Sequence, residues 1–255
     1  MLIVLSPAKR LDFTEPDPAL PASERRFLED TASLARTARG RTVAELRRLM
    51  SISDDLARLN RERFQAFDPE STEGVQAAFA FAGDVYEGLG ARELDAAGLA
   101  FAQDHVRILS GLYGLLRPLD RIQPYRLEMG TRLKTRRGST LYDFWGDRIA
   151  RQLNADAEGQ DQSVLVNLAS QEYFGVVDAK ALKLPVVTPH FRESRDGESR
   201  IISFFAKKAR GGMTRFAIDE RITRAEDLKA FDRDGYRFDK AASTDTEWIF
   251  IRAGN

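Results

Sequence analysis

The sequence predicts an α+β fold: one compact domain over residues 1–255, in which a mixed sheet packs against helices. Helical periodicity dominates the first half of the chain, whereas short apolar strand patterns dominate the second half. The two kinds of element do not alternate as a regular βαβ series, which would indicate a doubly wound parallel sheet. No internal repeat and no long linker divides the chain, and 255 residues can share one core.

The first half of the chain is predicted to open with a strand and continue with helices. The apolar run at residues 2–5 ends at Ser6-Pro7 and fits a short buried strand. Residues 77–82 fit a strand or a buried helix equally well, because periodicity does not separate the two. Helices are predicted over residues 23–39, 42–50 and 91–110 and from residue 53 onward, with N-caps at Ser23, Thr42 and Ser53.

The second half is predicted to hold one further helix and then strands. The helix covers residues 139–153, with its large apolar side chains on one side. The strands cover residues 164–166, 186–187, 200–205 and 247–251. The last of them alternates in the manner of a half-buried strand.

Composition excludes several classes of site. The chain has no Cys and only two His, so a disulfide, a thiolate metal site and a multi-histidine metal site are all excluded. We therefore expect no metal and no cofactor. The apolar N-terminal run is too short for a signal peptide, and no window approaches the roughly 20 apolar residues of a transmembrane helix. We expect a cytoplasmic protein without membrane contact.

Positive charge is concentrated in two segments of a chain whose 39 basic and 39 acidic residues balance. Residues 107–137 hold eight basic and two acidic residues, and residues 192–215 hold seven basic and three acidic residues. Residues 1–106 are mildly acidic, with 13 basic and 18 acidic groups. Such segregation is how a local anion-binding surface is made.

The first candidate constellation is the glycine-punctuated stretch at residues 109–120. A helix that ends at Gly111, a short apolar turn and a second helix from Gly114 outline a helix-hairpin-helix element over about residues 94–125. Glycines let the backbone approach a DNA phosphate closely. Two residues separate the glycines where the common hairpin has one, so a tight helical corner with packing glycines is the alternative. The arginines that would add charge here are Arg107, Arg117 and Arg121.

Two further constellations are basic. Tyr125 and Arg126 follow a proline, and a Tyr–Arg pair can stack on a base or bind phosphate. Arg126 and Glu128 share one face of an extended strand. The remainder of residues 121–137 is equally compatible with a solvated charged face. After the predicted strand at residues 200–205, at a strand end where anionic ligands often bind, come Lys207, Lys208 and Arg210.

The fourth constellation follows the predicted strand at residues 164–166. Ser170 is placed to cap the next helix, while Asn167 and Glu172 offer polar groups at the carboxyl end of the strand. A small-molecule pocket there would need Lys9 or Arg210 nearby to neutralise Glu172. The alternative is a helix cap with a structural ion pair. The pocket candidates are Tyr125, Glu128, Asn167, Ser170, Glu172 and Tyr173.

Seven ordered segments of the chain resemble the YaaA peroxide-stress family. They are SPAK (6–9), SISDDLARLN (51–60), GDVYEGL (83–89), LSGLYGLLRPLDRIQPYRLEMG (109–130), LYDFWGD (141–147), NLASQEYF (167–174) and ISFFAKKARGGMTRF (202–216). The resemblance implies an unusual α+β fold and protection against hydrogen peroxide, linked to limiting free iron and damage to DNA. It also implies binding of double-stranded DNA in a positively charged cleft with a helix-hairpin-helix element.

Two functions are therefore expected as alternatives. The first is binding of duplex or branched DNA without sequence specificity, with Lys9, Arg126, Lys207, Lys208 and Arg210 as cleft candidates. The second is an enzyme that acts on a nucleotide or another phosphorylated, anionic small molecule around Lys9, Asn167, Glu172 and Lys207. Plain DNA binding would not need Glu172, which is what favours the second. Direct iron sequestration is the weakest hypothesis, because the sequence lacks the ligands that a dedicated iron site usually employs.

Overall fold

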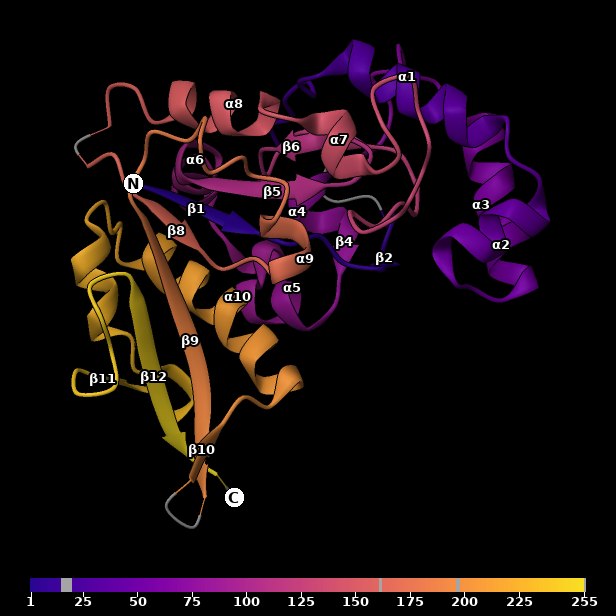
Figure 1. Cartoon of the computed structure of the whole chain (residues 1–255). Helices are drawn as coiled ribbons and strands as arrows, with labels where there is room; N and C mark the ends of the chain where they lie inside the picture. Colours follow the sequence, from indigo (N-terminus) through magenta and orange to yellow (C-terminus); the bar gives the residue numbers. More distant parts are fainter. Residues whose placement is uncertain (15–19, 161, 196–197, 255) are drawn as a thin grey trace.

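Five parallel strands form the centre of the structure (Figure 1). The computed structural model describes residues 1–14, 20–160, 162–195 and 198–254. In spatial order the central strands are β12 (Glu247–Ala253), β9 (Val186–Arg195), β8 (Leu165–Asn167), β1 (Leu2–Leu5) and β5 (Val106–Ser110). The antiparallel strands are β11 (Arg237–Asp239) beside β12, β6 (Gly114–Leu116) beside β5, and β10 (Glu198–Arg200) beside β9.

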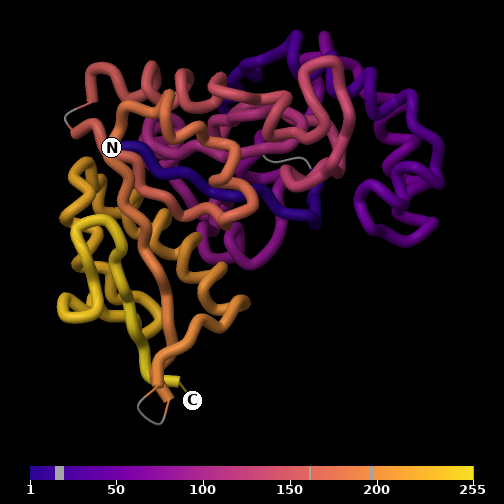
Figure 2. The backbone as a smooth tube through the Cα atoms, in the orientation of Figure 1, coloured from indigo at the N-terminus to yellow at the C-terminus, as the bar shows by residue number. Residues whose placement is uncertain are grey.

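The parallel centre corrects the predicted α+β class, because it makes the protein an α/β domain. The mixed sheet and the single compact domain are as expected. Ile3 of β1 pairs with Val106 on one side and Val166 on the other, and both neighbours run parallel to it. Figure 2 shows the indigo N-terminal strand between segments from much later in the chain. The crossovers from β1 to β5 and from β5 to β8 contain several short elements, so the sequence does not show a simple βαβ alternation.

The helices flank the sheet, and the first three lie on one side of the molecule, away from β9 and β12 (Figure 1). These three are α1 (Leu28–Arg39), α2 (Val43–Met50) and α3 (Asp54–Ala66). The others are α4 (Ala77–Ala80), α5 (Asp84–Leu89), α6 (Ala96–His105), α7 (Leu141–Trp145), α8 (Arg148–Asp156), α9 (Gln171–Phe174) and α10 (Ser203–Asp219). Two small sheets pair β2 (Arg10–Leu11) with β4 (Phe81–Ala82) and β3 (Val75–Gln76) with β7 (Arg121–Ile122).

Several elements form as local chemistry predicts. The strand at residues 2–5 is confirmed and is buried along its whole length. Thr42 and Glu45 form the predicted capping box, and Ser53 and Ser170 cap α3 and α9. The predicted strands at residues 164–166, 186–187 and 247–251 correspond to β8, β9 and β12, with the last two longer than expected. Residues 77–82, for which the sequence predicts either a strand or a buried helix, form α4 followed by β4.

Three predicted boundaries are wrong. Ser23 does not cap the first helix, since its hydroxyl donates to Asp120 Oδ1 at 2.6 Å and accepts from Gln103 Nε2 at 2.8 Å. The helix instead begins at Leu28. The predicted helix at residues 139–153 divides into α7 and α8 at Gly146, whose φ is +51°. The predicted strand at residues 200–205 is largely the start of α10, whose small and apolar residues recur at helical spacing.

The helix-hairpin-helix prediction for residues 94–125 is also wrong. The first helix of the predicted pair ends at His105, and residues Val106–Ser110 are a buried strand, because pairing with β1 overrides their helical pattern. Gly111 and Gly114 belong to the turn that joins antiparallel β5 and β6. A Cβ on Gly111 would lie 2.2 Å from the carbonyl oxygen of Leu127. Both glycines therefore serve close packing, Gly111 against the backbone of Leu127 and Gly114 against the ring of Trp145.

Candidate functional site

The carboxyl ends of β1, β5 and β8 bring three polar residues to one edge of the sheet. Ser6 follows β1, Ser110 ends β5 and Asn167 ends β8. Ligands of parallel sheets bind outside the carboxyl ends of the strands. Ser170, at the start of α9, joins this edge: its backbone N–H donates to Ser6 Oγ at 2.9 Å, and Ser6 Oγ donates to Ser170 Oγ at 3.3 Å.

Three buried tyrosines lie beneath this edge. The Tyr86 hydroxyl donates to the carbonyl oxygen of Ser6 at 3.0 Å, and the hydroxyls of Tyr125 and Ser110 are 2.6 Å apart. Burial raises the pKa of Tyr86, Tyr125 and Tyr173 above the ordinary phenol value, and each of the three pKa values is raised further by a neighbouring tyrosine. All three phenols therefore stay neutral at physiological pH.

Two cations share one carboxylate above the tyrosines. Lys9 Nζ lies 3.3 Å and Arg126 Nη2 lies 2.9 Å from Glu128 Oε1. These side chains line one small hollow together with Tyr125 and Tyr173. The side chain of Lys9 is 65% exposed, whereas those of Arg126 and Glu128 are 18% exposed. The hollow therefore has a carboxylate at its base and an accessible ammonium group at its rim.

Arg63 of α3 is a third cation near Arg126, outside the residues that line this hollow. Burial lowers the pKa of Arg63, and the nearby charge of Arg126 lowers it further. Within the described part of the chain, the Arg63 side chain has neither a hydrogen-bond acceptor nor an ion-pair partner. Arg126 is paired with Glu128, so Arg63 is the guanidinium here that an anion would stabilise.

Helix α10 supplies a second group of cations beside the same edge. Lys207 Nζ lies 3.7 Å from Asp84 Oδ2 at the start of α5. The preceding residue, Gly83, adjoins the segment after β1, since a Cβ built there would lie 3.4 Å from the Cβ of Ala8. Lys9 and Lys207 therefore flank one corner, formed by Gly83 and Asp84. Lys208 is exposed, and no partner of its side chain occurs among the described residues.

Arg210 is the least satisfied cation of this helix. It lies three residues after Lys207 and four before the fully buried Thr214, so it shares their helical face. Its side chain is half-buried, and burial lowers the pKa of the guanidinium. In the ranges that the structure describes, no acceptor or carboxylate contacts this guanidinium. A cation withdrawn from water without an acceptor is costly unless an anion is bound.

We define the basic cluster as six cations, namely Lys9 and Arg126 at the hollow, Arg63 near Arg126, and Lys207, Lys208 and Arg210 of α10. The carboxylates that pair with them in the described residues are Glu128 and Asp84. Six cations against two carboxylates leave an excess of positive charge at the sheet edge.

The arginines predicted from residues 107–121 do not join the basic cluster. Arg107 is buried and pairs with Asp156. Arg117 pairs with the buried Asp120, with its Nη2 3.0 Å from Asp120 Oδ1. Arg121 lies at a different cavity, described below. These side chains interact with the protein itself or lie elsewhere, so the basic cluster retains only Lys9, Arg126, Lys207, Lys208 and Arg210 of the predicted cations.

The predicted small-molecule pocket is only partly assembled. Asn167 Oδ1 accepts from the backbone N–H of Ala169 at 3.0 Å, and Ser170 caps α9, so both have structural roles. Glu172 is exposed and accepts from the backbone N–H of Gly130 at 2.9 Å. No ion pair between Glu172 and a cation occurs in the described residues. Glu128, and not Glu172, is the carboxylate that the cations surround.

Sequence analysis missed Arg63, Tyr86, Ser6 and Ser110 as site residues. Tyr86 lies in the GDVYEGL segment and Ser6 in the SPAK segment, both of which carry the family resemblance, so a signal was present for these two. Arg63 occurs among many arginines of α2 and α3, and no local pattern distinguishes it. Across the described residues, no group of three or more His, Cys, Asp or Glu could hold a metal ion, and no helix is long and apolar enough to cross a membrane.

Fold and site together define an α/β protein with a basic cluster above buried tyrosines at the carboxyl edge of its sheet. The peroxide stress protein YaaA family matches residues 1–242. A UPF0246 protein of Caulobacter vibrioides (strain NA1000 / CB15N) is 64% identical over 252 residues, which cover 99% of each chain. One from Phenylobacterium zucineum is 65% identical over 99% of this chain and 95% of its own, and one from Ruegeria pomeroyi is 55% identical over 99% and 98%. The chain belongs to the YaaA peroxide stress protein family.

Proposed function

We propose that this YaaA-family protein protects the cell against peroxide by binding duplex or branched DNA without sequence specificity. The observation that carries the proposal is the excess charge of the basic cluster, above all the half-buried Arg210 without an acceptor. Phosphate oxygens are the acceptors that Arg and Lys bind without reading base sequence. The proposal does not depend on a helix-hairpin-helix element, and the family's link to free iron would follow from protected DNA, not from an iron site.

The proposal is tested by the dependence of DNA affinity on salt. If each cluster cation neutralises one phosphate, the logarithm of the association constant falls against the logarithm of salt concentration with a slope of about −5. A duplex and a four-way junction of equal composition separate the two DNA forms. Fluorescence anisotropy at several salt concentrations gives the slope for each.

Matched charge variants locate the contact. Replacing Lys208 and Arg210 together by Gln is expected to make the slope less steep by about 2. The control is Lys240→Gln, because Lys240 is exposed and lies after β11, outside the basic cluster. The control slope should equal that of the wild type. A flat salt response of the wild type, or equal slopes for the double variant and the control, would refute DNA binding by this cluster.

A second candidate function is an enzyme for a nucleotide or another phosphorylated small molecule. The observation in its favour is the set of buried phenols and serine hydroxyls below the cations, because a track of phosphate contacts does not need them. Calorimetric titration with ADP tests it. Saturable binding of one ADP that disappears in Lys9→Gln would support a nucleotide site, and the absence of heat would exclude this nucleotide as a ligand.

A further inference from the structure

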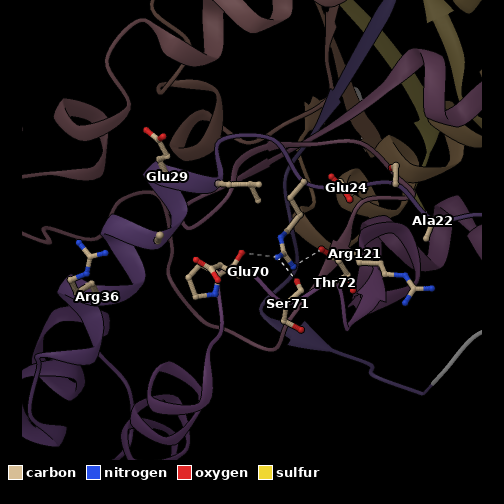
Figure 3. Close-up of a pocket in the computed structure, with 13 residues that line it drawn as sticks. Ala22, Glu24, Glu29, Arg36, Glu70, Ser71, Thr72 and Arg121 are labelled. Atoms are coloured by element: carbon tan, nitrogen blue, oxygen red, sulfur yellow. Dashed lines mark hydrogen bonds between the residues drawn. The ribbon is translucent and has the colours of Figure 1, made fainter.

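A cavity lies away from the basic cluster, between α1 and two loops (Figure 3). Its volume is about 700 Å³, which is in the range of small-molecule sites. One wall is a stripe of α1 made by Leu28, Ala32 and Arg36 at spacings of four residues. The opposite side is formed by the loop that contains Pro69 and by Arg121 of β7.

Arg25 lines this cavity and is 8% exposed. Its guanidinium donates to the carbonyl oxygens of Arg121 at 3.1 Å, Ser71 at 2.8 Å and Pro69 at 3.3 Å. Its Nε has no partner, and among the described residues no carboxylate forms an ion pair with it. Carbonyl dipoles therefore hold Arg25 in place but leave its charge without a counter-ion.

Arg121 adds a second unpaired cation to the cavity. Its carbonyl oxygen is fixed by Arg25, whereas its own half-buried guanidinium has no acceptor in the part of the chain that the structure describes. In Figure 3 the Arg121 side chain extends away from the α1 wall, so Arg121 and Arg36 lie toward opposite ends. Donors of Arg121 are thus open to a ligand on the side where Arg25 supplies buried charge.

The start of α1 points to a ligand as well. Phe27, the N-cap residue, has φ +53°, a left-handed conformation that is uncommon for a bulky residue. No side chain caps this helix. The first N–H groups of a helix need acceptors from outside it, and those of Leu28 and Glu29 belong to residues that line the cavity.

The other residues that line the cavity restrict the class of ligand that can bind there. Leu28 is 46% exposed although it is a large apolar residue, and Ala22, Ala32 and Pro69 extend the apolar lining. Three exposed glutamates, Glu24, Glu29 and Glu70, also line the cavity. Their charge disfavours a polyanion such as DNA or a triphosphate. An apolar body with a single negative charge is compatible with both the glutamates and the buried arginine.

We propose that this cavity binds a small amphipathic monoanion of the carboxylate class. Arg121 takes the carboxylate beside the buried charge of Arg25, and the hydrocarbon part lies on Leu28 and Ala32. The cavity is separate from the basic cluster, so a test of carboxylate binding is independent of a test of DNA binding.

Isothermal titration calorimetry with octanoate tests the proposal. Acetate carries the charge without the chain and 1-octanol the chain without the charge, so octanoate should bind one per protein and at least about tenfold tighter than either. Arg121→Gln should weaken octanoate about tenfold to a hundredfold, because it removes a charge-assisted hydrogen bond. Leu28→Gln should weaken it about tenfold by removing apolar contact.

Lys240→Gln removes the same charge outside the cavity and should leave octanoate affinity unchanged. Circular dichroism melting of each variant confirms that it is folded, and Arg121 and Leu28 were chosen over the buried Arg25 for this reason. Absence of octanoate binding, equal affinity for octanoate and 1-octanol, or equal affinity in Arg121→Gln and Lys240→Gln overturns the proposal.

Discussion

Arg107 of β5 and Asp156 of α8 form an ion pair in which both side chains are buried, with 5% and 4% exposed. Arg26 donates to both oxygens of the same carboxylate. One buried carboxylate therefore neutralises two guanidinium groups that come from distant parts of the chain. This arrangement fixes α8 against the sheet at the edge opposite the basic cluster, because Arg107 lies near the amino end of β5.

Asp156→Asn should lower the free energy of unfolding by about 3 kcal/mol or more, since it leaves two cations without a counter-ion. Urea denaturation measures the change. The control is Asp147→Asn, which removes an exposed pair with Arg151 and should cost at most about 1 kcal/mol. Equal losses in the two variants would contradict a structural role for the buried network.

The same carboxylate gives stability a defined dependence on pH. Burial alone would raise the pKa of Asp156, but the charge of Arg107 and hydrogen bonds from Arg26 and Arg107 hold that pKa below its ordinary value. A lowered pKa means that the ionised form stabilises the fold above about pH 4 and that this contribution is lost as the pH falls further. Urea midpoints between pH 3 and pH 6 should therefore decline more steeply in the wild type than in Asp156→Asn.

Two adjacent glycines of α10 should respond oppositely to alanine. A Cβ on Gly211 would lie 1.8 Å from the carbonyl oxygen of Val85 in α5, so Gly211→Ala should lower the free energy of unfolding by about 3 kcal/mol. A Cβ on Gly212 would meet only the ring of Phe231, at 3.7 Å. Gly212→Ala should be neutral or stabilising by up to about 1 kcal/mol, because alanine favours helix. Thermal melts of both variants measure these changes in stability. A Gly211→Ala variant as stable as the wild type would contradict the close approach of α5 and α10.

The turn glycine Gly114 should affect stability and not DNA affinity. Its φ is +72°, and a Cβ there would lie 2.7 Å from the ring of Trp145. Gly114→Ala should thus be more destabilising than Gly159→Ala, where φ is +79° but no atom lies within 4 Å and the backbone strain is about 1–2 kcal/mol. Anisotropy on folded protein should give wild-type DNA affinity for both variants. A loss of DNA affinity in Gly114→Ala but not in Gly159→Ala would instead indicate that this turn binds a DNA phosphate.

Arg210 should show opposite effects on stability and on binding. Arg210→Met removes a cation that is half-buried without an acceptor, so the free energy of unfolding should rise by about 1 kcal/mol. DNA affinity should fall at the same time if the proposed function is right. Lys208→Met is the matched control for stability, because Lys208 is exposed and should give little change. A destabilised Arg210→Met would indicate an internal role for this guanidinium.

The sequence predicts well those features of the fold that depend only on residues close together in the chain. The caps at Thr42, Ser53 and Ser170 form because a hydroxyl and a backbone N–H three residues later are always within reach. The buried strand at residues 2–5 follows from its apolar run. Ser23 satisfies the same local rule but fails, because Asp120 and Gln103 take its hydroxyl across the fold.

What the sequence does not predict depends on partners far along the chain. Val106–Ser110 continues the pattern of the helix before it, and only pairing with β1 makes it a strand. Because of the same pairing, the expected corner between two helices is a turn between two strands. The parallel pairing also makes the fold class α/β and not α+β. In the site, Lys9 and Arg126 come from separate predicted segments and share Glu128, whereas their role in binding, with that of Lys207, stays a prediction. Arg63 of α3 lies near Arg126, and nothing near Arg63 in sequence indicates this position.

The central position of β1 also constrains how the protein is made. Ile3 pairs with Val106 and Val166, partners that leave the ribosome about 100 and 160 residues later. At synthesis rates of about 5–20 residues per second, the apolar residues Leu2–Leu5 wait on the order of ten seconds before both neighbours exist. During that interval the strand is an exposed hydrophobic segment without paired neighbours. We therefore expect the nascent chain to bind chaperones and the denatured protein to refold slowly.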